Sequence, residues 1–268
     1  MIMKDAPVIQ VQNLTCAYDD FVVVRNVSFD VHAGEVFVIL GGSGCGKSTV
    51  LKHIIGLYEP VEGSIMIHGR NMATATEAQR QEIMRDFGVM YQMGALFGSM
   101  SLLQNVMLPL EEFTDLPRQA REMVAMAKLA MVGLEQFAYN QPATLSGGMQ
   151  KRAAIARAMA LDPGILFLDE PSAGLDPVTS AELDELIRGL SRNLGITFVI
   201  VSHELASIYS IADRVIMLDR ASKGLVAEGD PRLLRDRPGN EVVGRFFNRQ
   251  PPQSAGRETC RVPVEEDA

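Results

Sequence analysis

A glycine-rich segment of the chain carries a lysine and two hydroxyl side chains at a spacing suited to phosphate binding. Residues 41–49 read GGSGCGKST and directly follow the apolar run EVFVIL. Glycines let the backbone wrap a phosphate with its N–H groups pointing inward, Lys47 can reach the β and γ oxygens, and Ser48 can ligate Mg²⁺. We expect the Cys45 side chain to face away from the phosphates. The phosphate-binding residues predicted from this pattern are Gly41, Gly42, Ser43, Gly44, Cys45, Gly46, Lys47, Ser48 and Thr49.

Two carboxylates end a second apolar run, ILFLDE at 165–170. Asp169 would lie at the carboxyl tip of a strand, where a phosphate-binding fold holds Mg²⁺ through water. Glu170 could polarise an attacking water. An Asp-Glu pair after a strand is by itself often a solvated turn, but together with the Lys47 loop it indicates phosphoryl transfer.

A third segment, LSGGMQKR at 145–152, begins a helix that is rich in alanine. Ser146 is a good N-cap, and Gly147 and Gly148 would expose backbone N–H groups at the positive end of the helix dipole. Such a helix end attracts an anion. Taken alone, the segment fits an ordinary capped loop equally well.

The hydropathy pattern places these groups on an α/β core. Alternation from Val8 to about Val38 indicates an antiparallel sheet leading into a buried strand. Further strands are predicted at 63–69, 87–92, 165–170 and 196–203, and helices at 102–110, 118–134 and 147–161, with a helical stripe of Leu183, Leu186, Ile187, Leu190 and Leu194. Strands alternating with helices imply a parallel sheet. The expected fold is therefore a P-loop NTPase core with a RecA-like parallel sheet, an antiparallel β subdomain and an inserted helical subdomain.

Composition limits the kind of protein this can be. The chain has 268 residues, 47% of them hydrophobic, and 25 basic against 33 acidic residues give a net charge of −8. This acidity argues against a nucleic-acid partner. No apolar run approaches the ~20 residues of a membrane span, and the N-terminus does not resemble a signal peptide. Three widely spaced cysteines, Cys16, Cys45 and Cys260, favour reduced thiols and a cytoplasmic location.

Together these motifs resemble the ATP-binding cassette (ABC) ATPases over roughly residues 8–230. The resemblance implies that Tyr18 stacks on adenine, and that Gln92 reaches Mg²⁺ or the attacking water and senses a membrane partner. It further implies that Asp176 crosses a dimer interface and that His203 contacts the γ-phosphate. Met149 replaces the more usual glutamine of the signature motif, but it lies past the phosphate-facing residues, so we do not expect ATP binding to fail.

The resemblance also implies a mechanism. Each ATP would lie between the Lys47 loop of one subunit and the Ser146 helix end of the other, so the active form would be a homodimer. The expected catalytic residues are Lys47, Gln92, Glu170 and His203, and the expected Mg²⁺ ligands are Ser48, Gln92 and Asp169, partly through water. The ATPase domain is predicted over 8–238 with its helical part at about 93–161, followed by an extension over 239–268 that is flexible after about 250.

Three kinds of ABC protein compete for this sequence. Members that act on DNA or the ribosome typically carry two cassettes or a long coiled coil, and this chain has neither. A regulator without a transport partner is the other alternative. We therefore favour a transporter subunit that sits peripherally on the cytoplasmic face of the inner membrane. Permease subunits on separate chains would dock beside Gln92, between the core and the helical subdomain.

Two stretches bear on the transported substrate. YQMGALFGSMSLLQNVMLPL at 91–110, and Met149 with the KRAAIARAMALDP run that follows, resemble the Mla and Mce group of phospholipid transporters. The resemblance implies a role in outer-membrane lipid asymmetry and an Mce-domain lipid-binding partner. An importer of amino acids or other small solutes is the alternative. Near the C-terminus, an apolar patch is predicted to pack on its own core or on the partner ATPase; it consists of Val242, Val243, Phe246 and Phe247.

Overall fold

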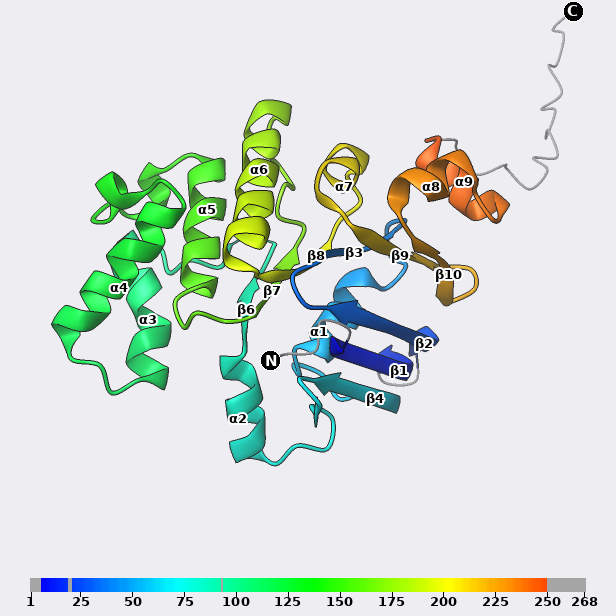
Figure 1. Cartoon of the computed structure of the whole chain (residues 1–268), viewed down its shortest axis with the longest axis horizontal. Helices are drawn as coiled ribbons and strands as arrows, with labels where there is room; N and C mark the ends of the chain where they lie inside the picture. Colours follow the sequence, from blue (N-terminus) through cyan, green and yellow to red (C-terminus); the bar gives the residue numbers. More distant parts are fainter. Residues whose placement is uncertain (1–5, 19–20, 93, 250–268) are drawn as a thin grey trace, which may run out of the picture.

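Two β-sheets form the framework of the molecule (Figure 1). The computed structural model describes residues 6–18, 21–92 and 94–249. The strands are β1 (Pro7–Tyr18), β2 (Phe21–His32), β3 (Val36–Gly41), β4 (Glu62–Ile67), β5 (Arg70–Asn71), β6 (Phe87–Met90), β7 (Ile165–Asp169), β8 (Thr197–Val201), β9 (Arg214–Asp219) and β10 (Gly224–Gly229). The smaller sheet has the order β2-β1-β4-β5 and is antiparallel, and the larger has the order β10-β9-β3-β8-β7-β6. In the larger sheet β9, β3, β8, β7 and β6 run parallel, which confirms the predicted fold class.

Nine helices of the described residues surround these sheets, and seven of them, α3 to α9, lie in three groups. Their bounds are α1 (Lys47–Ile54), α2 (Glu77–Arg85), α3 (Leu102–Phe113), α4 (Arg118–Met131), α5 (Gly147–Ala158), α6 (Pro177–Leu194), α7 (Leu205–Ile211), α8 (Pro231–Asp236) and α9 (Glu241–Phe247). Helices α3, α4 and α5 form a lobe at one side of the larger sheet, drawn in green in Figure 1. Helices α6 and α7 lie over the sheet, and α8 and α9 lie beyond β9 and β10.

The central strand β3 shows why the larger sheet is buried on both faces. Its side chains alternate between the two hydrophobic clusters, because successive residues of a strand point to opposite faces. Val38 and Leu40 pack in the cluster that includes residues of α5 and α6. Phe37 and Ile39 pack in the cluster that includes α1 and the antiparallel sheet. A strand covered on both sides therefore reads as an unbroken apolar run.

The parallel strands bring four distant chain segments to one edge of the sheet. β6, β7, β8 and β3 are parallel neighbours, so their carboxyl ends lie at the same edge of the sheet. The segments that follow them contain Gln92, Glu170, His203 and the Lys47 loop. Ligands of open α/β sheets bind in this position, outside the carboxyl ends of the strands.

Several predicted elements end earlier than expected. The strands predicted at 63–69 and 196–203 end at Ile67 and Val201, and the helices predicted at 118–134 and 147–161 end at Met131 and Ala158. The strand expected at 87–92 ends at Met90, so Gln92 lies in the turn beyond it.

The helical stripe predicted over 183–194 lies on α6, as expected. Leu183, Ile187 and Leu190 are buried, whereas Leu194 is 51% exposed at the end of the helix, before the left-handed cap Gly195.

The predictions for the cysteines and the C-terminal segment can be compared with the structure only in part. Cys16 and Cys45 are free thiols, whereas Cys260 and the segment after 249 lie outside the described residues. Within 6–18, 21–92 and 94–249, the helices are too short or too polar to cross a bilayer. The domain bounds stay a prediction.

Candidate active site

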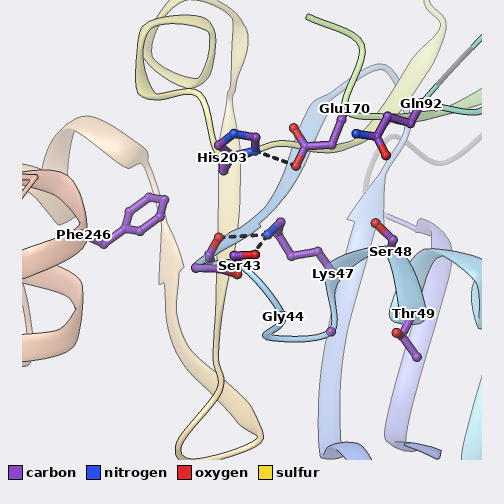
Figure 2. Close-up of a pocket in the computed structure, with 12 residues that line it drawn as sticks. Ser43, Gly44, Lys47, Ser48, Thr49, Gln92, Glu170, His203 and Phe246 are labelled. Atoms are coloured by element: carbon purple, nitrogen blue, oxygen red, sulfur yellow. Dashed lines mark hydrogen bonds and ion pairs between the residues drawn. The ribbon is translucent and has the colours of Figure 1, made fainter. Parts of the chain in front are cut away.

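A cavity of about 550 Å³ opens at the carboxyl edge of the larger sheet (Figure 2). Its walls come from the loop after β3, the start of α1 and the segments after β6, β7 and β8. The lining residues are Gly41, Gly42, Ser43, Gly44, Gly46, Lys47, Ser48, Thr49, Gln92, Glu170, His203 and Phe246. The structure thus brings together most of the residues predicted to act on a phosphate, although they are up to 162 positions apart (203 − 41).

The Lys47 loop is shaped to receive an anion. The Lys47 ammonium donates hydrogen bonds to the carbonyls of Gly41 and Gly42, at 2.9 and 3.1 Å, and is thereby held at the mouth of the loop. Gly46 has a φ of +100°, and a Cβ there would lie 2.4 Å from Cγ2 of Val24, so only glycine fits. Helix α1 begins at Lys47, which places its unpaired N–H groups and the positive end of its dipole in the cavity.

Oxygen ligands for a divalent cation lie at the side of this loop. The Ser48 hydroxyl donates to Oδ1 of Asp169 at 2.9 Å, and Asp169 is buried at the end of β7. Gln92 adds an amide to the same cavity. A hydroxyl, a carboxylate and an amide form a hard oxygen donor set of the kind Mg²⁺ prefers, so these residues fit that ion.

Glu170 is held in an unusual backbone conformation. Its φ is +50°, a left-handed value that costs a residue with a Cβ roughly 1–2 kcal/mol. The Glu170 N–H donates to the carbonyl of Val201 at 2.9 Å, which ties the turn to β8. Oε1 of Glu170 lies 2.8 Å from Nδ1 of His203. This backbone turn and the histidine together aim the carboxylate into the cavity (Figure 2).

Lys151 is a charged residue of the site that sequence reasoning missed. It lies on α5, is only 8% exposed, and its ammonium donates to the carbonyl of Gln92. Burial lowers the pKa of Lys151, while attraction to Asp169 and Glu170 acts in the opposite direction. The available signal was a lysine within an otherwise alanine-rich helix.

Two residues predicted to bind the nucleotide lie just outside the cavity. Cys45 is buried beneath the loop, as expected for its side chain, and burial raises the pKa of its thiol. Tyr18 lies at the end of β1, with its hydroxyl 3.4 Å from that of Thr49. The ring of Tyr58 packs edge-on against Tyr18 with centroids 5.4 Å apart. Tyr18 is thus connected to the loop through Thr49.

The signature segment does not join the cavity. Ser146 caps α5, as predicted, and its hydroxyl accepts a hydrogen bond from the Met149 N–H at 3.3 Å. Gly148 is buried, and a Cβ there would lie 2.3 Å from Cγ2 of Thr179. This glycine therefore allows α5 to approach α6 closely. Ser146, Gly147 and Gly148 are all missing from the described lining of the cavity.

Asp176 also has a local partner in the single chain. It caps α6, and its carboxylate accepts hydrogen bonds from the N–H groups of Val178 and Thr179 at 3.0 and 3.1 Å. Hydrogen bonds from Thr179 hold the pKa of Asp176 below its usual value. This capping role was not anticipated, although the Asp-Pro pair that begins the helix is a typical signal for it.

Comparison with known proteins identifies the family. The profile described as ABC transporter matches residues 24–173. The probable ribonucleotide transport ATP-binding protein mkl of Mycobacterium leprae is 40% identical over 240 residues, which is 90% of this chain and 68% of that protein. This chain belongs to the ABC transporter family.

Other ABC proteins match more of their own length. The intermembrane phospholipid transport system ATP-binding protein MlaF of Haemophilus influenzae is 38% identical over 88% of both chains. MlaF of Escherichia coli is 39% identical over 82% of this chain and 81% of that protein. The dimeric post-hydrolysis structure of the ATP-binding cassette MJ0796 with ADP and Pi is similar with a TM-score of 0.75 and 32% identity, covering 83% of this chain and 98% of that one. As an ABC ATPase, the chain binds and hydrolyses ATP.

An aromatic side chain that was not predicted to line the cavity, that of Phe246, also forms part of its wall. Phe246 of α9 faces the Lys47 loop from the opposite side (Figure 2). Its neighbours Val243 and Phe247 are buried in the chain's own core, whereas Val242 is exposed. The apolar patch predicted near the C-terminus therefore packs mainly on its own chain, and Phe246 extends it to the nucleotide cavity.

Proposed function

We propose that this ABC ATPase is the energy-coupling subunit of a phospholipid transporter of the Mla type. The observation that carries the proposal is the similarity to the two MlaF proteins, which covers at least 81% of both chains in each pair. The transporter would maintain the lipid asymmetry of the outer membrane. The cavity described above would supply the energy by hydrolysing ATP.

The residues in the cavity suggest how the γ-phosphoryl group passes to water. The Lys47 ammonium would exchange its two loop carbonyls for the β and γ oxygens of ATP. The Glu170 carboxylate would accept a proton of the water whose oxygen attacks the γ-phosphorus, while the bond to the β–γ bridging oxygen breaks and ADP leaves. His203 holds this carboxylate at 2.8 Å and can interact with the γ-phosphate when it is present.

A magnesium ion would complete the charge balance. We propose Ser48, Asp169 and Gln92 as the residues that hold it, partly through water, because they form the oxygen donor set beside the loop. When bound, the ion would neutralise charge on the phosphates.

The second half of each site would come from a second copy of the chain. Ser146 and the N-terminus of α5 present a capped, positive helix end outside the cavity of their own chain, which suits the γ-phosphate of a nucleotide bound by a partner. Asp176 would lie at the same interface. The dimeric MJ0796 cassette supports this arrangement.

The other partners follow from the same proposal. Permease subunits on separate chains would dock beside Gln92 and hold the ATPase on the cytoplasmic face of the inner membrane. An Mce-domain protein would carry the lipid. The 40% identity to a protein named for ribonucleotide transport keeps a small-solute transporter as a second candidate.

The proposal can be tested by purifying the tagged chain from detergent-solubilised membranes of its own organism. We expect mass spectrometry to identify a permease, an Mce-domain protein and phospholipid enriched over a parallel preparation of an untagged strain. A permease recovered with a small-solute binding protein would replace the lipid by a small solute. Recovery with ribosomes or DNA and no membrane protein would contradict the transporter function itself.

A further inference from the structure

The segment that carries Gln92 crosses from the core to the helical lobe without regular secondary structure. We call residues 91, 92 and 94–101, between β6 and α3, the Gln92 strap. The Gly94 N–H donates to the carbonyl of Tyr91 at 2.6 Å, which makes a tight turn. Gly94 and Ala95 both have left-handed backbones, with φ of +71° and +49°. Strained, irregular backbone of this kind persists only where its surroundings hold it in place.

Two cations of α5 hold the first part of this strap. The Lys151 ammonium donates to the carbonyl of Gln92. The Arg157 guanidinium donates to the carbonyls of Ala95 and Gly94, at 2.7 and 3.0 Å. Gly94 also lies close to the helix, since a Cβ there would be 3.5 Å from the Cβ of Ala154. Three carbonyls of the strap, those of Gln92, Gly94 and Ala95, are therefore bound by side chains of one helix.

The far end of the strap is held by the same lobe. Asn105 of α3 is fully buried, and its Oδ1 accepts a hydrogen bond from the Phe97 N–H at 2.8 Å. Its Nδ2 donates to the carbonyls of Phe97 and Ser101, at 3.1 and 3.0 Å. The strap is thus attached to α3 and α5 by polar contacts, and it follows directly after the last residue of β6.

Helix α5 connects these attachments to the signature end. It is 12 residues long, with Ser146 at its N-terminus and Arg157 in its last turn. A helix of this length is a rod of roughly 18 Å. Because the rod is stiff, a displacement of the strap at Lys151 or Arg157 must move the Ser146 end as well.

We propose that Lys151 and Arg157 are positioning residues that fasten the Gln92 strap to the signature helix. Gln92, which already lines its own chain's cavity, then changes its position there together with any movement of Ser146 toward the partner's nucleotide. The inference rests on the roles proposed above for Gln92 and Ser146. It assigns these two basic side chains a task in ATP hydrolysis without any contact to ATP.

A double-mutant cycle tests the part played by Lys151. We expect Lys151→Met to lower kcat by about tenfold with little change in the KM for ATP, as for the loss of one hydrogen bond from a charged donor. Lys151→Arg should restore most of kcat. In a Gln92→Ala background, Lys151→Met should have no further effect, because it acts through Gln92. An equal loss of kcat in both backgrounds would overturn the proposal.

A matched control separates positioning from stability. Lys128 on α4 is also buried, at 4% exposure, but its ammonium pairs with Asp162. Lys128→Met should leave kcat of the folded protein unchanged. A loss as large as that of Lys151→Met would mean that removing any buried lysine of the lobe is sufficient, and the proposal would be wrong.

Hydrogen exchange tests the attachment without relying on catalysis. In Arg157→Lys, which keeps the charge but loses the planar fork, we expect exchange in the 91–101 peptide to become about tenfold faster. Lys128→Met should not change it. Unchanged exchange in Arg157→Lys would overturn the attachment. If exchange rises as expected while Gln92→Ala alone leaves kcat intact, the attachment stands and the proposed catalytic role of Gln92 fails.

Discussion

The residues proposed to bind one nucleotide form two groups, and only one of these groups lies together in a single chain. Around the Lys47 loop, Glu170, His203 and Gln92 already line one cavity. The second group consists of Ser146 and Asp176, and each caps the helix that it begins. The first group thus lies together within a single chain, which we call the assembled half of the site. The second group lies at the N-termini of α5 and α6, outside the described lining of that cavity.

The difference reflects the supports of the two groups. The first group follows neighbouring parallel strands, whose hydrogen-bonded register brings their carboxyl ends together. The second group lies at the ends of α5 and α6, whose positions are set by side-chain packing such as that of Gly148 on Thr179. A sheet can therefore complete its half of a site alone, whereas we propose that the helix ends bind a nucleotide held by another chain.

The largest effect is expected at Glu170, the residue that should act only within the assembled half. Glu170→Gln keeps the size and the contact with His203 but removes the general base, so kcat should fall by about 10²–10⁴-fold. ATP binding and ATP-dependent dimerisation should remain, as measured by calorimetry and light scattering. Glu185→Gln on the exposed face of α6 is the control. Near-normal phosphate release by Glu170→Gln would contradict the assignment.

Complementation between two inactive variants tests whether the halves come from different chains. Lys47→Met destroys the assembled half and Ser146→Arg blocks the other. An equal mixture should regain up to roughly one quarter of wild-type ATPase, because half of the dimers are mixed and each has one intact site. Thr76→Arg, which alters the N-cap of α2, controls for damage to a helix cap. Failure of the mixture to exceed either variant alone would argue against a shared site.

A buried carboxyl on α6, the helix that begins at Asp176, makes the stability of the protein depend on pH. Burial raises the pKa of Asp184 from 3.8 to about 6. The native state therefore favours its neutral form, and the stability it contributes is complete below pH 3.8 and lost as pH rises through 6. By pH 8 the loss should reach about 3 kcal/mol. Asp184→Asn should remove this dependence, so that urea unfolding at pH 8 shows a more stable protein.

The neighbouring Glu185→Gln is again the control for Asp184, since its side chain is 71% exposed. It should shift the unfolding midpoint by little at either pH. The free energy of unfolding of Asp184→Asn should exceed that of the wild type by more at pH 8 than at pH 5. If the difference is the same at both pH values, the ionisation of Asp184 does not lower the stability of the protein.

The smallest effect is expected at Tyr18, at the margin of the assembled half. Tyr18→Ala should raise the KM for ATP by about tenfold through loss of base stacking, with kcat nearly unchanged. Tyr18→Phe keeps the ring and loses only the contact with Thr49, so it should behave almost like the wild type. Tyr139→Ala, which removes an exposed ring of the helical lobe, serves as the control. An unchanged KM in Tyr18→Ala would place adenine elsewhere.

Features that depend on neighbours in the chain could be predicted well. The loop at 41–49, the apolar strands before it and before Asp169, and the Ser146 cap all follow from local rules of turn, strand and helix formation. Errors occurred where an element ends. The strand predicted to reach Gln92 ends at Met90, and the helix predicted over 118–134 ends at Met131, because the ends of helices and strands are decided by caps and packing rather than by periodicity.

Side chains that act on distant segments were missed. Lys151 binds the carbonyl of Gln92, 59 positions away, and Arg157 binds that of Gly94, 63 positions away. Phe246 lines the cavity on the side opposite the Lys47 loop. The sequence around Arg157 and Phe246 gives no local sign of such a partner, and the alanine-rich surroundings of Lys151 do not indicate which carbonyl it binds.

The sequence alone determined the chemistry available to this protein: a phosphate loop, two carboxylates after a strand, a capped glycine-rich helix start, and the order in which they occur. Local hydrogen bonding and alternating hydropathy suffice for these, since they involve residues within a few positions of each other. Only the tertiary structure decided which groups meet. The register of β3, β8, β7 and β6 gathers the first group at one edge. Helix α5 packs closely on α6 and is bonded to the Gln92 strap, and its Ser146 end lies outside the described lining of its own chain's cavity.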